Sequence, residues 1–216
     1  MLELYTYFRS SASFRVRIAL GLKDLPWEPH VIWLPEGEQA GADYVATNPQ
    51  ALVPTLVDDG RALGQSIAIM EYLDETRPPA VLLPSDPVAR ARVRSLALLV
   101  ACDIHPLNNL RVLKYLKRTL GHEQPAIDTW YRHWCAEGLT ALERDLAGNA
   151  ATGRFCHGDA PTMADCCLVP QVFNARRFEV DLSGYPTVMR IHDACMALPA
   201  FDAAQPSRQP EADRAG

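Results

Sequence analysis

A serine cluster near the N-terminus, Ser10-Ser11-Ala12-Ser13, has the residue types of an anion-binding site. Residues 2–7 predict a strand and residues 14–22 a helix, so the cluster lies where that helix begins. Serine is a preferred N-cap, and the first turn of a helix has unpaired N–H groups and a positive dipole end. Such a helix start stabilises an anion or a thiolate. An ordinary capped helix after a strand explains the same residues equally well.

Two further motifs nearby could bind a peptide-like ligand. Pro54 opens a predicted strand, and a cis Val53-Pro54 bond would turn the Val53 N–H and C=O outward to pair with an extended ligand. Gln65-Ser66 begins a predicted helix over 66–76, where a hydroxyl, an amide and free N–H groups suit a carboxylate. Taken alone, a simple helix cap is the better explanation of Gln65-Ser66.

The second half of the chain has a candidate cluster around Pro106. This proline removes a helical hydrogen bond, so His105, Asn109 and Arg111 are expected to gather near one helix break. Arg176-Arg177 lies on a later predicted helix, which begins with a capping motif. Without other evidence, a lone histidine is more often structural, and a surface arginine pair is more often solvated.

Periodicity places these motifs in two domains. Residues 1–79 alternate strand and helix signals and include a hairpin at Asp59-Gly60. This order predicts an α/β domain with one mixed sheet of about four strands. A proline-rich linker is predicted over 80–87, and an all-helical domain over 88–204 that opens with a long helix over 88–104. The tail, 205–216, is polar and is predicted to be disordered.

Composition excludes several functional classes. The 216 residues carry a net charge of −5, which provides no basic field for nucleic acid or anionic lipid. No apolar run reaches the roughly 20 residues of a membrane span, and the N-terminus lacks a signal-peptide pattern. Six cysteines without CxxC spacing indicate reduced thiols and a cytoplasmic protein. The histidines have no metal-ligand spacing, so no metal is expected.

Together these motifs resemble the glutathione transferase superfamily, and specifically its zeta class. The resemblance covers nearly the whole chain and implies a thioredoxin-like α/β N-terminal domain followed by an all-α C-terminal domain. The motifs that carry it are Ser10-Ser11-Ala12-Ser13-x-Arg15-Val16-Arg17-Ile18-Ala19-Leu20, Asn48-Pro49 with Val53-Pro54, Gln65-Ser66-x-Ala68-Ile69-x-Glu71-Tyr72-Leu73, and Asp159-x-x-Thr162-Met163-Ala164-Asp165.

The resemblance implies roles for individual residues. Ser10 would lie beside the glutathione sulfur, with Arg9 as a second catalytic residue on the substrate side. Ala12 stands where the family often has cysteine, so a dehalogenase that needs a protein thiol there is not expected. The implied glutathione-binding residues are Ser10, Ser11, Ala12, Ser13, Phe14, Arg15, Gln39, Val53, Gln65, Ser66, His105, Asn109, Leu110 and Arg111. The implied substrate-binding residues are Arg9, Arg111, Arg177 and Arg176, with Arg177 favoured over Arg176.

The implied activity is glutathione-dependent cis–trans isomerisation of a maleyl keto acid by thiolate addition, bond rotation and elimination. Conversion of maleylacetoacetate to fumarylacetoacetate and of maleylpyruvate to fumarylpyruvate both remain open. One alternative is a transferase that conjugates small electrophiles or dehalogenates α-haloacids. Another is a non-catalytic glutathione-fold binding protein. The resemblance also implies a homodimer, and neither a nucleic-acid nor a membrane partner is expected.

Overall fold

The computed structural model describes residues 1–78 and 82–215 and divides into two compact units. Met1–Leu83 and Met196–Gly216 form the first unit, and Pro84–Cys195 forms the second. This boundary falls inside the predicted linker, of which residues 80 and 81 lie outside the described residues, as do Pro79 and Gly216. The sequence predicted that the helical domain runs to residue 204 and that a free tail follows over 205–216. In the structure, Met196–Gly216 belongs to the first unit.

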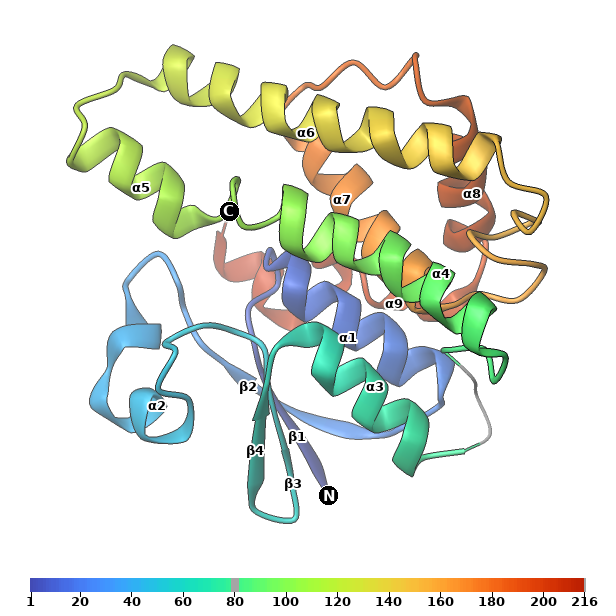
Figure 1. The fold of residues 1–216 in the computed structure, drawn as a ribbon. Coiled ribbons are helices and arrows are strands. Elements are labelled where there is room, and N and C mark those ends of the chain that lie inside the picture. Colours follow the sequence, from blue (N-terminus) through green and yellow to red (C-terminus); the bar gives the residue numbers. More distant parts are fainter. Residues whose placement is uncertain (79–81, 216) are drawn as a thin grey trace. The chain divides into compact units, whose positions relative to one another are not determined.

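The first unit contains the predicted mixed sheet, with four strands in the order β2-β1-β3-β4 (Figure 1). The inner strand β1 pairs in parallel with β2 and antiparallel with β3, which continues into β4 through the Asp59-Gly60 turn. The strands are β1 (Leu2–Thr6), β2 (Trp27–Val31), β3 (Thr55–Asp58) and β4 (Arg61–Gly64). The prediction of a four-stranded mixed sheet is confirmed.

Two helices of this unit, α1 (Ser11–Leu22) and α3 (Ser66–Thr76), pack against each other and against the sheet. Their apolar residues join those of β1 and β3 in one fully buried cluster, formed by Leu2, Leu4, Val16, Leu20, Leu56, Ile69 and Leu73. Burying such side chains stabilises the unit by roughly 1.5–3 kcal/mol each. The N-terminal ends of both helices are therefore held on a rigid base.

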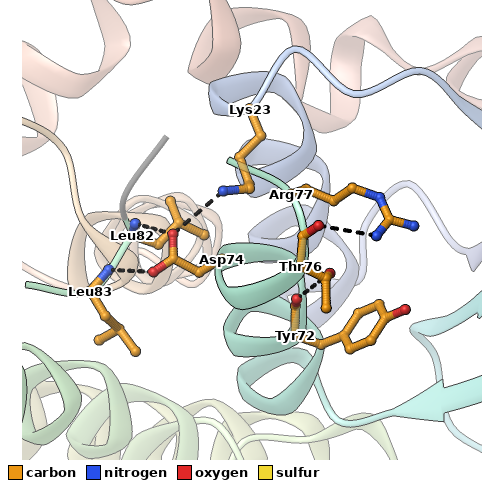
Figure 2. Close-up of polar contacts among 7 residues, drawn as sticks. All are labelled: Lys23, Tyr72, Asp74, Thr76, Arg77, Leu82 and Leu83. Carbon is orange, nitrogen blue, oxygen red and sulfur yellow. Dashed lines mark hydrogen bonds and ion pairs between the residues drawn. The ribbon is translucent and has the colours of Figure 1, made fainter. Parts of the chain in front are cut away.

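A buried ion pair ties α1 to α3 (Figure 2). Lys23 Nζ lies 3.4 Å from Asp74 Oδ1, and both side chains are almost completely buried. The same carboxylate accepts hydrogen bonds from the N–H groups of Leu82 (2.6 Å) and Leu83 (3.1 Å). Asp74 therefore holds Leu82 and Leu83, the last two residues of the Met1–Leu83 part of the unit, against α3.

The segment between β2 and β3 contains two short helices that the sequence did not predict, η1 (Glu38–Ala40) and α2 (Ala42–Thr47). Each is too short to show a repeating amphipathic pattern. Tyr44 of α2 is buried and joins a second hydrophobic cluster with Tyr7, Phe8, Trp33 and Val53. Two members of this cluster, Tyr7 and Phe8, directly precede the serine-rich turn in the chain.

The C-terminal segment is ordered within the first unit, so the predicted disorder of 205–216 is wrong for its described residues. Its helices are α9 (Pro199–Ala203), η3 (Pro206–Arg208) and η4 (Pro210–Ala215). Helix α9 packs against α1 at Gly21, where an added Cβ would lie 3.2 Å from the Ala200 Cβ. The buried Gln209 amide donates to the carbonyls of Ala203 (2.9 Å) and Gln205 (3.0 Å). Such internal contacts order a polar segment that composition alone favours as disordered.

The second unit is helical in its described residues, as predicted. Its helices are α4 (Pro87–Leu98), the π-helix η2 (Leu99–Ile104), α5 (Leu110–Arg118), α6 (Gln124–Ala147), α7 (Met163–Arg177) and α8 (Pro186–Met196), whose last residue belongs to the first unit. The long helix predicted over 88–104 is thus an α-helix that widens into a π-helix. The predicted capping motif at Thr162 and Asp165 is confirmed as a capping box. None of the helices in the described residues is long and apolar enough to cross a bilayer.

Candidate functional site

Ser10 caps the N-terminus of α1, as the sequence predicted. Its Oγ accepts a hydrogen bond from the Ser13 N–H at 3.2 Å, and its own N–H donates to the Tyr7 carbonyl at 2.9 Å. The cap occupies an acceptor lone pair of the hydroxyl and leaves its proton available for another acceptor. The first turn of α1 contains no acidic residue. Ser10 can therefore donate to an anion beside a positive helix end.

The start of α3 meets a buried arginine from α1. Arg15 is only 2% exposed, and its Nη1 donates to Ser66 Oγ at 3.2 Å. Ser66 is the first residue of α3 rather than its N-cap, a position that Gln65 occupies. The guanidinium and the helix N-terminus both favour negative charge, and a carboxylate matches their N–H donors. This pairing of Arg15 with Ser66 could not be read from their separation in the sequence.

The backbone of Gln65 is strained. Its φ of +68° lies in a region that side-chain-bearing residues rarely adopt, and its amide donates to Gln50 Oε1 at 2.9 Å. Such a conformation costs of the order of 1–3 kcal/mol and is found preferentially at functional sites. The strained residue and the buried cation are adjacent features of the same helix start.

Val53 lies in a backbone segment that polar side chains hold in place. The Val53-Pro54 peptide bond is cis. The Tyr44 hydroxyl (2.6 Å) and the Asn48 amide (2.9 Å) both donate to the Leu52 carbonyl, and both contact the Thr55 hydroxyl. Burial raises the pKa of Tyr44, so its phenol stays protonated as a donor. Sequence reasoning missed Tyr44 and Thr55, since nothing in the spacing marks them.

The other implied residues of the first unit take different positions. Arg9 is exposed, with its guanidinium 4.9 Å from the centre of the Phe8 ring. Ser13 and Phe14 are almost completely buried, so their side chains serve packing. Gln39 lies in η1, and within the described part of the chain no hydrogen bond joins it to Ser10 or to the Val53 segment. Ser11 is buried and Ala12 is half-buried.

In the second unit, the implied residues gather where η2 ends and α5 begins. Asn109 is the N-cap of α5, with its Oδ1 accepting from the Arg111 N–H at 3.1 Å. Its Nδ2 lies 3.4 Å from His105 Nε2. Leu110 is 43% exposed, and Arg111 is also exposed. His105 and Asn109 are therefore in contact, and Arg111 joins them through its backbone N–H. π-Helices such as η2 are frequent at functional sites.

Arg176 and Arg177 are both exposed at the end of α7, in different surroundings. Burial raises the pKa of the Tyr131 phenol, and the nearby Arg177 charge opposes that rise. The Tyr131 carbonyl accepts from Asn108, in the turn that precedes α5. Arg176 instead lies near His192, whose pKa burial lowers. Arg177 is thus the arginine associated with the residues that support the η2–α5 turn.

Comparison with known proteins agrees with this architecture. Residues 9–76 match the glutathione S-transferase N-terminal domain and residues 125–194 the C-terminal domain. A probable maleylacetoacetate isomerase of Vibrio cholerae is 47% identical over 213 residues, 98% of each chain.

Two solved structures extend this similarity. One is the holo structure of a bacterial zeta-class transferase, a maleylpyruvate isomerase, with a TM-score of 0.94 and 47% identity over 97% of this chain and 99% of that one. The other is a maleylacetoacetate isomerase of Methylobacterium extorquens with bound malonate and glutathione, with a TM-score of 0.95 and 46% identity over the same shares of the two chains. The chain therefore belongs to the glutathione S-transferase family, in its zeta class.

Proposed function

We propose that this chain is an enzyme that catalyses glutathione-dependent cis–trans isomerisation of a maleyl keto acid. The observation that carries the proposal is the Ser10 hydroxyl at the start of α1, close in sequence to an arginine that reaches the start of α3. Relatives named maleylacetoacetate isomerase and maleylpyruvate isomerase, each about 47% identical over nearly the whole chain, support the assignment. Both keto acids remain candidate substrates.

The residues of the first unit fit the chemistry of glutathione. The Arg15–Ser66 pair and the start of α3 suit the γ-glutamyl carboxylate, since they combine a buried cation with the N–H groups of a helix N-terminus. The backbone of Val53 suits the cysteinyl peptide, which it would pair with as an added strand. With these two groups bound, the Ser10 hydroxyl would lie beside the glutathione sulfur. Bound glutathione supplies a nucleophilic thiol that adds reversibly to the activated double bond.

The task of Ser10 is to hold that sulfur as a thiolate. A thiol with a pKa near 8.5 is only slightly ionised at neutral pH, and lowering its pKa by about two units requires about 2.7 kcal/mol. A helix N-terminus supplies roughly 0.3–1 kcal/mol. A hydrogen bond to a charged group supplies roughly 1.5–3 kcal/mol. The helix start alone is therefore insufficient, whereas the start of α1 and the Ser10 hydroxyl together reach the required value.

The task of the arginines is to bind the substrate and stabilise charge. A maleyl keto acid presents carboxylates, and guanidinium groups bind carboxylates through two parallel hydrogen bonds. We assign this role to Arg9, Arg111 and Arg177, all of which are exposed. Negative charge that develops on the substrate carbonyl oxygen is stabilised by the same cations. Arg176 is the weaker assignment because its neighbour is His192.

Two further properties belong to the proposal. A homodimer is expected from the family, and sedimentation measurements would test it. A cytoplasmic location is supported by the six free thiols, five of which are buried.

The test of the function is an isomerase assay on maleylacetone with and without glutathione. Isomerisation that depends on glutathione supports the proposal. Conjugation or halide displacement without any isomerisation would replace it by the transferase alternative.

A further inference from the structure

A second arginine of α1, Arg17, connects the serine-rich turn to the other end of the chain. It is 3% exposed, and its Nη2 donates to the Phe8 carbonyl at 3.0 Å. Its Nη1 donates to Thr6 Oγ1 at 3.2 Å and lies 3.5 Å from the Tyr7 carbonyl. Its Nε donates to the Ala204 carbonyl at 3.1 Å. One buried guanidinium thus holds the turn before Ser10 and the C-terminal segment.

The partners of Arg17 are unusual for a buried cation. Among the residues that the structure describes, the hydrogen bonds that Arg17 donates all go to uncharged oxygens, so no hydrogen-bonded carboxylate neutralises its charge. Burial lowers its pKa to about 10, and the Glu211 carboxylate of the C-terminal segment opposes that shift. A buried charge costs less when all its donors are satisfied, so this arrangement favours one fixed geometry of the carbonyls around it.

The C-terminal segment reaches the same turn by a second route. The Arg214 guanidinium lies 4.5 Å from the centre of the Trp33 ring and 3.5 Å from Glu36. Trp33 stacks on Phe8 at 6.0 Å and meets the edge of Tyr7 at 5.3 Å. A guanidinium over the face of an indole ring is attracted to it electrostatically. The segment therefore supports both the carbonyls and the rings of the turn.

We propose that the C-terminal segment, residues 196–215, positions Ser10 through Arg17 and Trp33. The Tyr7 carbonyl links Arg17 to Ser10, since it lies near the Arg17 guanidinium and accepts a hydrogen bond from the Ser10 N–H. Arg17 is a positioning residue, because it acts on Ser10 through the Tyr7–Phe8 backbone. This inference rests on the proposed function for its catalytic consequence, although the ordering of the turn can be measured without any ligand.

The test compares two arginines of the C-terminal segment. Arg214→Ala removes the contact with Trp33. Arg208→Ala is the matched control, since Arg208 also forms an exposed ion pair, with Asp202 at 3.3 Å, and has no aromatic partner among its described contacts. Arg17→Lys is the third variant, because lysine keeps the charge and cannot reproduce the planar fork of donors.

Hydrogen exchange of the amides of residues 7–14 is measured first, on the ligand-free chain. We expect faster exchange in Arg214→Ala and in Arg17→Lys, and none of this acceleration in Arg208→Ala. The pH profile of glutathione-dependent turnover is the second readout. If Ser10 is displaced, the pKa of the glutathione thiol rises and the ascending limb of the profile moves to higher pH. A shift of one unit lowers turnover about tenfold at pH values well below that limb's midpoint.

Exchange in Arg214→Ala that matches Arg208→Ala would overturn the proposal. So would an Arg17→Lys chain that melts at a lower temperature with the pH profile of its folded form unchanged, since a purely structural role predicts that result. If the unaltered chain shows no isomerisation, the proposed function fails, and the exchange comparison still tests the positioning by itself.

Discussion

Replacing Ser10 by glycine separates its two roles, capping α1 and stabilising a thiolate. The cap is one acceptor bond from the Ser13 N–H at 3.2 Å. Alanine at this position loses the cap at a cost of about 0.5–2 kcal/mol, whereas glycine costs only a few tenths. Both variants lose the hydroxyl donor, so they are expected to differ in stability and to share the same catalytic defect.

The catalytic defect follows from the strength of the lost hydrogen bond. A bond of roughly 1.5–3 kcal/mol to the thiolate corresponds to about one to two pKa units, so a thiol pKa near 6.5 rises to about 7.5–8.5 and the thiolate fraction at pH 7 falls about 3- to 25-fold. Glutathione affinity is expected to change little, because the Arg15–Ser66 pair is intact. Turnover at high pH should recover as the thiol ionises without help.

The assay measures turnover against pH for the original chain, Ser10→Gly, Ser10→Ala and Ser10→Thr, with glutathione binding followed by calorimetry. Ser10→Thr is the control because it keeps a hydroxyl and a cap. If Ser10→Gly turned over at neutral pH as fast as the original chain, the reasoning would be refuted. Equal losses in Ser10→Ala and Ser10→Thr would also refute it.

Three further substitutions test the framework around the site. Asp74→Asn leaves the buried Lys23 without its carboxylate and should destabilise the chain by about 3–5 kcal/mol, measured by urea unfolding. His192 has its pKa lowered from 6.5 by burial, so the folded form binds fewer protons than the unfolded one. Stability should therefore fall as the pH drops from 6.5 through the lower folded value, and His192→Gln should flatten that part of the unfolding profile. Gly138→Ala places a Cβ 2.2 Å from Ile104 Cγ1, and thermal melting should show a loss of about 1–3 kcal/mol. Unchanged stability in Asp74→Asn or Gly138→Ala, or an unchanged pH dependence of unfolding in His192→Gln, would contradict the surroundings described for that residue.

Local sequence signals were sufficient for much of the fold and part of the site. The strand, the helix and the cap at Ser10 depend on neighbouring residues, and each was found where predicted. The hairpin and the capping box of α7 also depend on short spacings. The contact between His105 and Asn109 could also be predicted, because the two residues are close in the sequence and lie on either side of a helix break.

Contacts between distant segments could not be predicted in this way. Arg15 meets Ser66 from 51 positions away, and Arg17 meets Ala204 from 187 positions away. A buried arginine bound to carbonyls leaves no pattern of opposite charges in the sequence. The C-terminal segment was misjudged because its polar Gln209 side chain bonds within the segment and its Ala204 carbonyl accepts a hydrogen bond from Arg17 of α1. The π-helix η2 was missed because its apolar residues continue the spacing of α4.

The central claim is that glutathione is a cofactor, which the chain returns unchanged, and not a substrate. The most direct measurement follows cis substrate, trans product and free glutathione thiol in one reaction with substrate in large excess over glutathione. We predict complete conversion of the cis acid to the trans acid with the thiol concentration constant throughout. Loss of one thiol for each substrate molecule, or conversion at the same rate without glutathione, would contradict the proposal.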